Sequence, residues 1–242
     1  MEVGEGLIVG RADQDAKEVV IPDDPAKGEA VFFIADGHTG EKVPLKEGLE
    51  AAEEAISEAR DAYLGYSGDI ESSIKSAFSE AEKVLSNTAH PDAGTTLTMI
   101  VKKGKWAYIG WVGDSMPYGV GKNDLSIIEK MEPHHWPDRD YHYGSLLSRS
   151  LGDKRLKKKS GGEMRSDPDI MRVPWRDFLL ATDGLLELFK GKEIVQFCRQ
   201  HGKTGAARML VREGKRRIKL LTEACHRGER LVPPDDATFL LF

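Results

Sequence analysis

The sequence predicts an α+β fold built from antiparallel sheets and separate layers of helices. Strand-like segments occur in groups joined by tight turns, and helix-like segments occur in pairs. The two kinds do not alternate as they would in a parallel sheet. The chain has 242 residues, of which 40% are hydrophobic and 31% charged, enough for one large domain with a substantial core.

The first third of the chain contains three strand-like segments and then two helix-like segments. The strand-like segments are rich in Val, Ile and Phe and are separated by Asp, Pro and Gly. The helix-like segments carry Ala, Leu and Ile at helical spacing, and Asp69 suits the N-cap of the second. We expect strands at 6–10, 16–21 and 30–35 and helices at 44–64 and 69–85.

The rest of the chain begins with a β-rich block. Two strands within 95–115 are joined at Lys103-Gly104-Lys105, and a second hairpin at 118–129 turns at Asn123-Asp124. Near the C-terminus, a short apolar run and a final apolar segment flank two amphipathic stretches. The further expected elements are a helix at 141–151, a polar basic loop at 152–166, a buried strand at 178–183, helices at about 185–201 and 204–228, and a last strand at 237–242.

Composition argues against several classes of protein. The net charge of −5 gives no reason to expect a nucleic-acid or membrane partner. No apolar run approaches the roughly 18 residues of a membrane helix, and the N-terminus does not have the pattern of a signal peptide. Cys198 and Cys225 make neither a metal-ligand spacing nor a disulfide framework. We therefore expect a cytoplasmic, free-standing, monomeric domain.

Aspartates mark the ends of the strand-like segments. They are Asp36 in "FFIADGHTG", Asp114 in "WVGDS", Asp183 in "FLLATDG", and Asp235 and Asp236 in "PPDDATFLLF". Each alone is well explained by a turn, but together they suggest carboxylates that converge at one edge of a sheet core. Converging carboxylates repel, and a set of Asp without Cys suits hard cations such as Mg²⁺ or Mn²⁺. These patterns leave two interpretations open, a two-metal hydrolase and a set of scattered turns.

Eight motifs, taken in order, resemble those of the metal-dependent protein phosphatases of type 2C. They are "GRADQDA" (10–16), "FFIADGHTG" (32–40), "AGTTLTMIV" (93–101), "WVGDS" (111–115), "LLSRSLGD" (146–153), "DPDI" (167–170), "FLLATDGLLEL" (178–188) and "DDAT" (235–238). The resemblance spans nearly the whole chain. It implies a four-layer α-β-β-α sandwich with two central antiparallel sheets flanked by helix pairs. It also implies a single PPM-type catalytic domain over residues 1–242, with a flap-like loop at about 152–166.

The resemblance also implies a reaction. Phosphoserine and phosphothreonine monoesters of proteins would be hydrolysed by direct attack of a hydroxide that bridges two Mn²⁺ or Mg²⁺ ions, in a signalling role. The implied metal ligands are Asp36, the Gly37 carbonyl, Asp183 and Asp235, with Asp114 helping to bind a third ion. Asp36 is also counted as catalytic because it would bridge the metals.

Four further residues receive roles from the same resemblance. His38 matches the general-acid candidate, since an imidazole can protonate a leaving oxygen. Arg11 matches the arginine that binds phosphate, with His38 beside the substrate. Asp15 and Asp236 match positions near the metals and their waters.

The sequence departs from the family pattern at several positions. Arg11 lies four residues before Asp15, where five is common, Thr39 replaces a glycine, Met116 replaces an arginine, and Asp236 stands where Asn is usual. His134 and His135 fall where the family has an Asp-His pair. Two alternatives stay open: a phosphatase of a small phosphorylated metabolite, and an inactive phosphatase-fold module with a regulatory or binding role.

Overall fold

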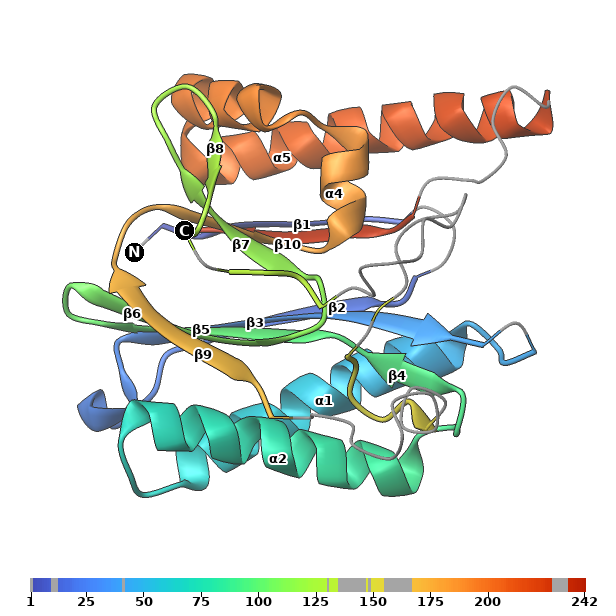
Figure 1. Ribbon diagram of the computed structural model, residues 1–242. Helices are drawn as coiled ribbons and strands as arrows, with labels where there is room; N and C mark the ends of the chain where they lie inside the picture. Colours follow the sequence, from blue (N-terminus) through green and yellow to red (C-terminus); the bar gives the residue numbers. More distant parts are fainter. Residues whose placement is uncertain are drawn as a thin grey trace. The chain divides into compact units, whose positions relative to one another are not determined.

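The computed structural model describes residues 2–9, 13–40, 42–129, 131–134, 147, 149–154, 167–227 and 235–242. The chain divides into two compact units. Unit 1 comprises Met1–Asp13, Met116–Glu132 and Arg176–Phe242, and unit 2 comprises Gln14–Ser115 and Pro133–Trp175. Each unit contains one antiparallel sheet with helices on one of its faces (Figure 1).

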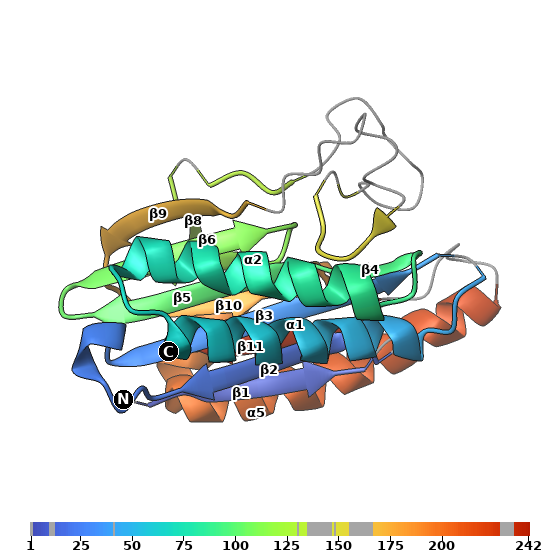
Figure 2. The same ribbon diagram turned by 90° about the horizontal axis from the view of Figure 1, so that it is seen from below.

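The sheet of unit 2 has the strand order β2-β3-β5-β6-β9, with β4 paired to the far part of β3. Its strands are β2 (Asp15–Val20), β3 (Ala30–Thr39), β4 (Ala93–Thr95), β5 (Leu97–Lys103), β6 (Trp106–Val112) and β9 (Asp169–Pro174). Two long helices, α1 (Lys46–Gly65) and α2 (Ile70–Thr88), lie side by side against one face (Figures 1 and 2), and a short 3-10 helix, η1, spans Pro25–Lys27.

Small residues bring α1 close to the sheet of unit 2. Ala51, Ala52, Ala55 and Ala59 are buried on one stripe of the helix, at the spacing that places residues on one face. They pack in the same core as Phe33 of β3. At the next helix, the Asp69 side chain accepts a hydrogen bond from Ser72 N at 2.9 Å, so the predicted N-cap is confirmed.

The sheet of unit 1 has the order β1-β11-β10-β7-β8. Its elements are β1 (Gly4–Ile8), β7 (Met116–Val120), β8 (Leu125–Ile127), β10 (Phe178–Ala181), β11 (Ala237–Leu241), α4 (Asp183–Leu188) and α5 (Gly191–His226). α5 lies along β1 (Figure 1). Its backbone is non-helical at Gly202, where φ is +67°, so it consists of two helical segments. The break falls between the two predicted helices, but the helix predicted at about 185–201 is itself divided between α4 and the first of these segments.

Four predictions of secondary structure need correction. β3 does not end at residue 35 but continues to Thr39, because its last residues pair with β4. β4 and β9 were not predicted as strands. A helix over 141–151 is wrong for the described residues 149–151, because Leu151 forms an isolated bridge with Thr95 instead of helical bonds. Residues 141–146 and 148 lie outside the described part.

Two other expectations are only partly covered by the structure. Of the flap-like loop at 152–166, residues 155–166 lie outside the described residues. A single catalytic domain over residues 1–242 stays a prediction. Among the helices that the structure describes, none combines the length and the apolar character needed to cross a membrane.

A buried hydrogen bond joins α1 to η1 and contributes to the stability of unit 2. The hydroxyl of Tyr63 is fully buried and donates to the Lys27 carbonyl at 2.6 Å, and burial raises the pKa of this hydroxyl. Tyr63→Phe leaves that carbonyl without its partner, so we expect a loss of about 1–2 kcal/mol in the free energy of unfolding by urea. Tyr66→Phe, at an exposed ring, is the control. Equal stability of the two variants would contradict this account.

Candidate active site

Asp36 lies inside β3, at the point where this strand changes its partner from β5 to β4. Thr96 stands between those two strands. Its amide donates to the Asp36 carbonyl at 2.9 Å, and its hydroxyl accepts from the Asp36 amide at 2.9 Å. The Thr95 hydroxyl also donates to the Asp36 carbonyl, at 3.0 Å. These threonines bind the backbone of Asp36, while its carboxylate stays half-buried.

A second carboxylate lies directly across the strand pair from Asp36. Asp15 of β2 is its register partner, and residues opposite each other project from the same face of a sheet. Asp15 is 6% exposed. Two carboxylates on one face favour a bound cation, and their oxygens are the ligands that Mg²⁺ and Mn²⁺ prefer. The donor chemistry of this pair therefore fits the predicted metal.

Gly37 allows the start of α1 to approach β3. A Cβ atom at this position would lie 2.1 Å from the Gly48 carbonyl oxygen and 2.6 Å from the Gln14 carbonyl oxygen. The Gly37 amide donates to Gln14 O at 3.0 Å, so the contact is also a backbone hydrogen bond. Only a glycine fits between these backbone atoms.

His38 lies between two side chains of the "SRSLGD" motif. Its Nε2 is 2.6 Å from Ser150 Oγ, and its Nδ1 is 3.8 Å from Asp153 Oδ2. The Asp153 side chain is 3% exposed, whereas that of His38 is 23% exposed. Sequence reasoning gave Ser150 and Asp153 no role, although the quoted motif contains both.

Asp114 lies in a turn that is attached to Thr96. Gly113 has a φ of +105°, and a Cβ there would be 2.5 Å from Thr96 Cγ2. The next residue along, Ser115, is hydrogen-bonded through its hydroxyl to the Thr96 hydroxyl at 2.8 Å. One threonine therefore contacts both the backbone of Asp36 and the turn of Asp114.

His134 supports the same turn from the other side. Its Nδ1 accepts from the Gly113 amide at 2.9 Å, and its Nε2 is 2.8 Å from Asp169 Oδ2 and 2.8 Å from Arg149 Nη1. Its ring stacks on Trp111. These contacts are made to other groups of unit 2. The companion position, 135, lies outside the described residues.

Burial and charge shift two pKa values in this group. Burial lowers the pKa of His134, and the hydrogen bond that its ring donates to Asp169 offsets only part of this effect. Burial alone would raise the pKa of Asp169, but His134 and Arg149 outweigh it, so the net direction is downward. The geometry therefore favours a neutral imidazole next to an ionised carboxylate.

In unit 1, the other predicted aspartates lie at two adjacent segments. Asp183 is the exposed first residue of α4, and Asp235 is exposed just before β11. A Cβ at Gly184 would lie 1.7 Å from the Asp236 carbonyl oxygen, so this glycine lets the two segments meet. Asp236 is 3% exposed, and its amide donates to Asp235 Oδ1 at 2.9 Å.

The predicted residues thus fall into two sets. Unit 2 brings Asp15, Asp36, Gly37, His38 and Asp114 together, and unit 1 brings Asp183, Asp235 and Asp236 together. Within each unit, the described residues form no group of three or more His, Cys, Asp or Glu side chains arranged to hold a metal ion. Arg11 lies outside the described part of the chain.

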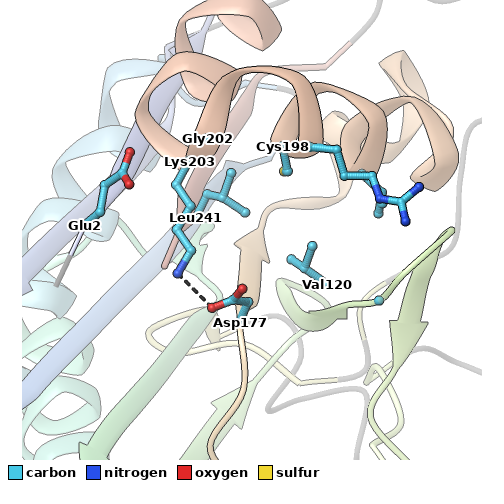
Figure 3. Close-up of a pocket in the computed structure, with 10 residues that line it drawn as sticks. Glu2, Val120, Asp177, Cys198, Gly202, Lys203 and Leu241 are labelled. Atoms are coloured by element: carbon cyan, nitrogen blue, oxygen red, sulfur yellow. Dashed lines mark hydrogen bonds and ion pairs between the residues drawn. The ribbon is translucent and has the colours of Figure 1, made fainter.

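A cavity of about 350 Å³ in unit 1 has different chemistry (Figure 3). Val120, Val195 and Leu241 line it together with polar residues. Lys203 and Asp177 point toward each other across it, with 2.8 Å between Nζ and Oδ1. Burial raises the pKa of the Cys198 thiol to about 11. The lysine already has a carboxylate partner, and Arg199 is a second cationic residue of the lining.

The opposed carboxylates of Asp15 and Asp36 suit a hard cation, and comparison with known proteins gives the family. The sequence matches the family Protein phosphatase 2C over residues 15–140 and 140–219. The chain therefore belongs to the protein phosphatase 2C family. The predicted resemblance to this family is confirmed.

Relatives from several organisms carry the same family name. A probable protein phosphatase 2C of Caenorhabditis elegans is 28% identical over 224 residues, which cover 81% of this chain and 61% of the relative. A probable protein phosphatase 2C of Arabidopsis thaliana is 28% identical over 212 residues, covering 77% of this chain and 72% of the relative. The chain thus spans about three fifths of the length of the first relative.

Solved structures share the fold. The serine/threonine phosphatase PstP/Ppp of Mycobacterium tuberculosis aligns with a TM-score of 0.71 at 18% identity, covering 99% of this chain and 97% of that one. A structure titled the S. agalactiae serine/threonine phosphatase aligns with a TM-score of 0.74 at 13% identity, covering 99% of this chain and 98% of that one. The predicted fold class, an α+β sandwich with two antiparallel sheets, is confirmed.

The contact between Gly37 and α1 gives a prediction for stability. Gly37→Ala places a methyl group against two backbone carbonyls, so we expect a loss of about 1–3 kcal/mol in the free energy of unfolding. Gly65→Ala is the matched control, because a Cβ at that helix end meets nothing within 4 Å. Urea unfolding of the metal-free chain measures both. A Gly37→Ala variant as stable as Gly65→Ala would refute the close approach.

The lowered pKa of His134 predicts a dependence of stability on pH. The imidazole binds a proton less readily in the folded than in the unfolded chain, so stability should fall as the pH drops below about 6.5. Asp169 contributes stability that is lost only in stronger acid, below its ordinary value near 3.8. His134→Asn should therefore lose less stability than the wild type between pH 7.5 and pH 5.

The measurement is urea unfolding of the metal-free chain at both pH values. His201→Asn, at an exposed histidine, is the control and should follow the wild type. If His134→Asn and the wild type lose the same stability, burial of the imidazole does not disfavour its charged form.

Proposed function

We propose that the chain is a metal-dependent phosphoprotein phosphatase that hydrolyses phosphoserine and phosphothreonine monoesters. The observation that carries this proposal is the opposed pair Asp15 and Asp36 on one face of the unit 2 sheet, in a chain of the 2C family. A solved neighbour of this fold is titled the catalytic domain of PstP in complex with two manganese ions, with a TM-score of 0.67 at 18% identity. That title supports a divalent metal such as Mn²⁺, and we propose Mn²⁺ or Mg²⁺ as the cofactor.

The proposed metal ligands are Asp36, the Gly37 carbonyl, Asp183 and Asp235, and Asp114 would help to bind a third ion. When bound, such ions supply an activated water and neutralise charge on the phosphoryl group. Asp15 and Asp236 would hold waters around the ions through their carboxylates.

Two side chains of this chain would act on the substrate itself. Arg11 would bind two phosphoryl oxygens through its planar guanidinium. His38 would hold a proton at its imidazole and give it to the departing serine or threonine oxygen. The partly exposed ring of His38 supports this role, because a proton donor must reach the substrate.

Cellular context follows from the same proposal. A phosphoprotein substrate implies a role in signalling, and a reducing cytoplasm suits the two free cysteines, Cys198 and Cys225. We also keep the proposal of a monomer without nucleic-acid or membrane partners.

The exposed position of Asp235 favours it over Asp236 as the ligand of the pair. Asp236 is buried, and its backbone carbonyl packs against Gly184, whereas Asp235 is exposed to solvent, where an ion can reach it. Asn substitutions at these two adjacent residues therefore test which of the two carboxylates is the ligand.

The test is hydrolysis of a phosphothreonine peptide with Mn²⁺, with Mg²⁺ and with EDTA. We expect turnover that needs the metal and falls by at least about 100-fold in Asp183→Asn and in Asp235→Asn, because a group that stabilises charge at the reaction centre is lost. Asp236→Asn should retain much more activity, and Asp23→Asn, at an exposed residue, should match the wild type.

A well-folded chain without turnover at any metal concentration would reject the proposal and favour the inactive binding module. Turnover of small phosphate esters without turnover of any phosphopeptide would instead favour the metabolite phosphatase. Equal losses in Asp235→Asn and Asp236→Asn would reject the choice of ligand.

A further inference from the structure

The cavity of about 350 Å³ in unit 1 lies at the break between the two helical segments of α5 (Figure 3). We propose that it binds a small organic monoanion, a carboxylate whose apolar body has roughly seven to ten carbon atoms. The site is independent of the proposed function, because none of the residues that line the cavity is assigned to the metal ions, the phosphate or the proton.

The break in α5 leaves this space open between anchored pieces of backbone. At Gly202, where φ is +67°, the nearest described atom to an added Cβ is Glu2 Oε1, at 3.7 Å. The second segment is held against β1, because a Cβ at Gly4 would lie only 2.4 Å from the Lys203 carbonyl oxygen. The Glu2 side chain also accepts a hydrogen bond from the Thr204 amide at 2.9 Å. The walls of the cavity are therefore fixed.

The interior of the cavity is apolar. Val195 and Leu241 are 2% and 1% exposed, and Val120 lines the same space. The thiol of Cys198 behaves as part of this apolar wall, because burial raises its pKa to about 11 and keeps it neutral at physiological pH. An alkyl chain or an aromatic ring placed against these side chains would be removed from water, which favours binding.

The volume limits the size of the ligand. A cavity of roughly 150 Å³ holds a benzene ring, and pockets for small molecules start at roughly 300 Å³. A cavity of about 350 Å³ therefore has room for a medium-length alkyl chain or a fused pair of rings. Octanoate falls in this range.

The charges around the cavity are matched within the protein, with one exception. Lys203 and Asp177 form the ion pair that crosses it. The carboxylate of Glu2 accepts from the Thr204 amide, which lowers the pKa of Glu2. Arg199 is exposed, and no residue in the described part of the chain forms a hydrogen bond or an ion pair with its guanidinium. The charge that is left for a ligand is therefore a single cation.

A carboxylate suits this cation better than other groups do. The planar guanidinium of Arg199 can donate two parallel hydrogen bonds to one carboxylate. A cationic ligand would be repelled by Arg199. A dianion such as a phosphate monoester would carry more negative charge than one guanidinium offsets, beside the carboxylates of Glu2 and Asp177. The charge and the apolar interior together select a monoanion with an apolar body.

The first experiment is isothermal titration calorimetry of the metal-free chain with octanoate, 1-octanol and octylamine, which share one alkyl chain and differ in charge. We expect a Kd for octanoate at or below about 1 mM, binding of octanol about fivefold weaker, and no binding of octylamine. Arg199→Gln should weaken octanoate about fivefold and leave octanol unchanged. Arg208→Gln, at an exposed arginine of the same helix outside the cavity, should match the wild type.

The second experiment locates the bound octanoate through the two cysteines. Cys198 lines the cavity and Cys225 does not, although both are partly buried. Saturating octanoate should slow the reaction of Cys198 with N-ethylmaleimide, followed by mass spectrometry, and leave the rate at Cys225 unchanged. Val120→Phe, which places a ring at the half-buried edge of the cavity, should abolish binding of octanoate and of octanol alike.

Four results would overturn the proposal. They are no octanoate binding up to about 10 mM, equal affinities for octanoate and octanol, wild-type binding of octanoate by Arg199→Gln, and an unchanged labelling rate at Cys198. Because every measurement uses the metal-free chain, these results are independent of whether the chain hydrolyses phosphopeptides.

Discussion

The arrangement of unit 2 depends on the reciprocal hydrogen bonds between Thr96 and the backbone of Asp36. They occur where β3 leaves β5 and joins β4, so the strand continues without an unpaired backbone group at the junction. The carboxylate of Asp36 is thereby fixed opposite Asp15. Through its hydroxyl, the same threonine binds Ser115 and with it the turn of Asp114. Loss of Thr96 would therefore disturb the positions of three carboxylates, those of Asp15, Asp36 and Asp114.

Close backbone packing is the second constraint on the site. Gly37, Gly48 and Gly94 all stand where a Cβ would meet atoms of a neighbouring segment closer than 3.0 Å. Gly37 of β3 and Gly48 of α1 pack against each other and against Gln14, the residue before β2. Gly94 packs against the segment Ser150–Asp153, which contacts His38. A sheet edge that carries polar groups is usually open to water. Here glycines allow helices and loops to cover it, so that Asp15 and Asp153 are buried while Asp36 and His38 stay partly exposed.

Local sequence signals predicted most of the fold but not its junctions. Apolar alternation, the hairpin at Lys103-Gly104-Lys105 and the Asp69 cap act over a few residues, and the structure follows them. β4 and the bridge at Leu151 depend on pairing between distant segments, which no local pattern encodes. The Asp-Gly pair at 36–37 has the preferences of a turn, yet tertiary pairing keeps it in a strand. For the site, the motifs indicated Asp36, Gly37, His38 and Asp114, whereas Ser150 and Asp153 could be assigned only from their contacts.

One short segment connects the two histidines of unit 2. Arg149 contacts His134, which supports the Asp114 turn, and the next residues contact His38. The segment is fastened to α2 by the buried carboxylate of Glu82, which accepts from the Gly152 amide and also from the Ser86 hydroxyl. Because a buried carboxylate needs such donors, α2 and the segment stabilise each other. The helix that covers the sheet therefore also fixes the segment that contacts His38.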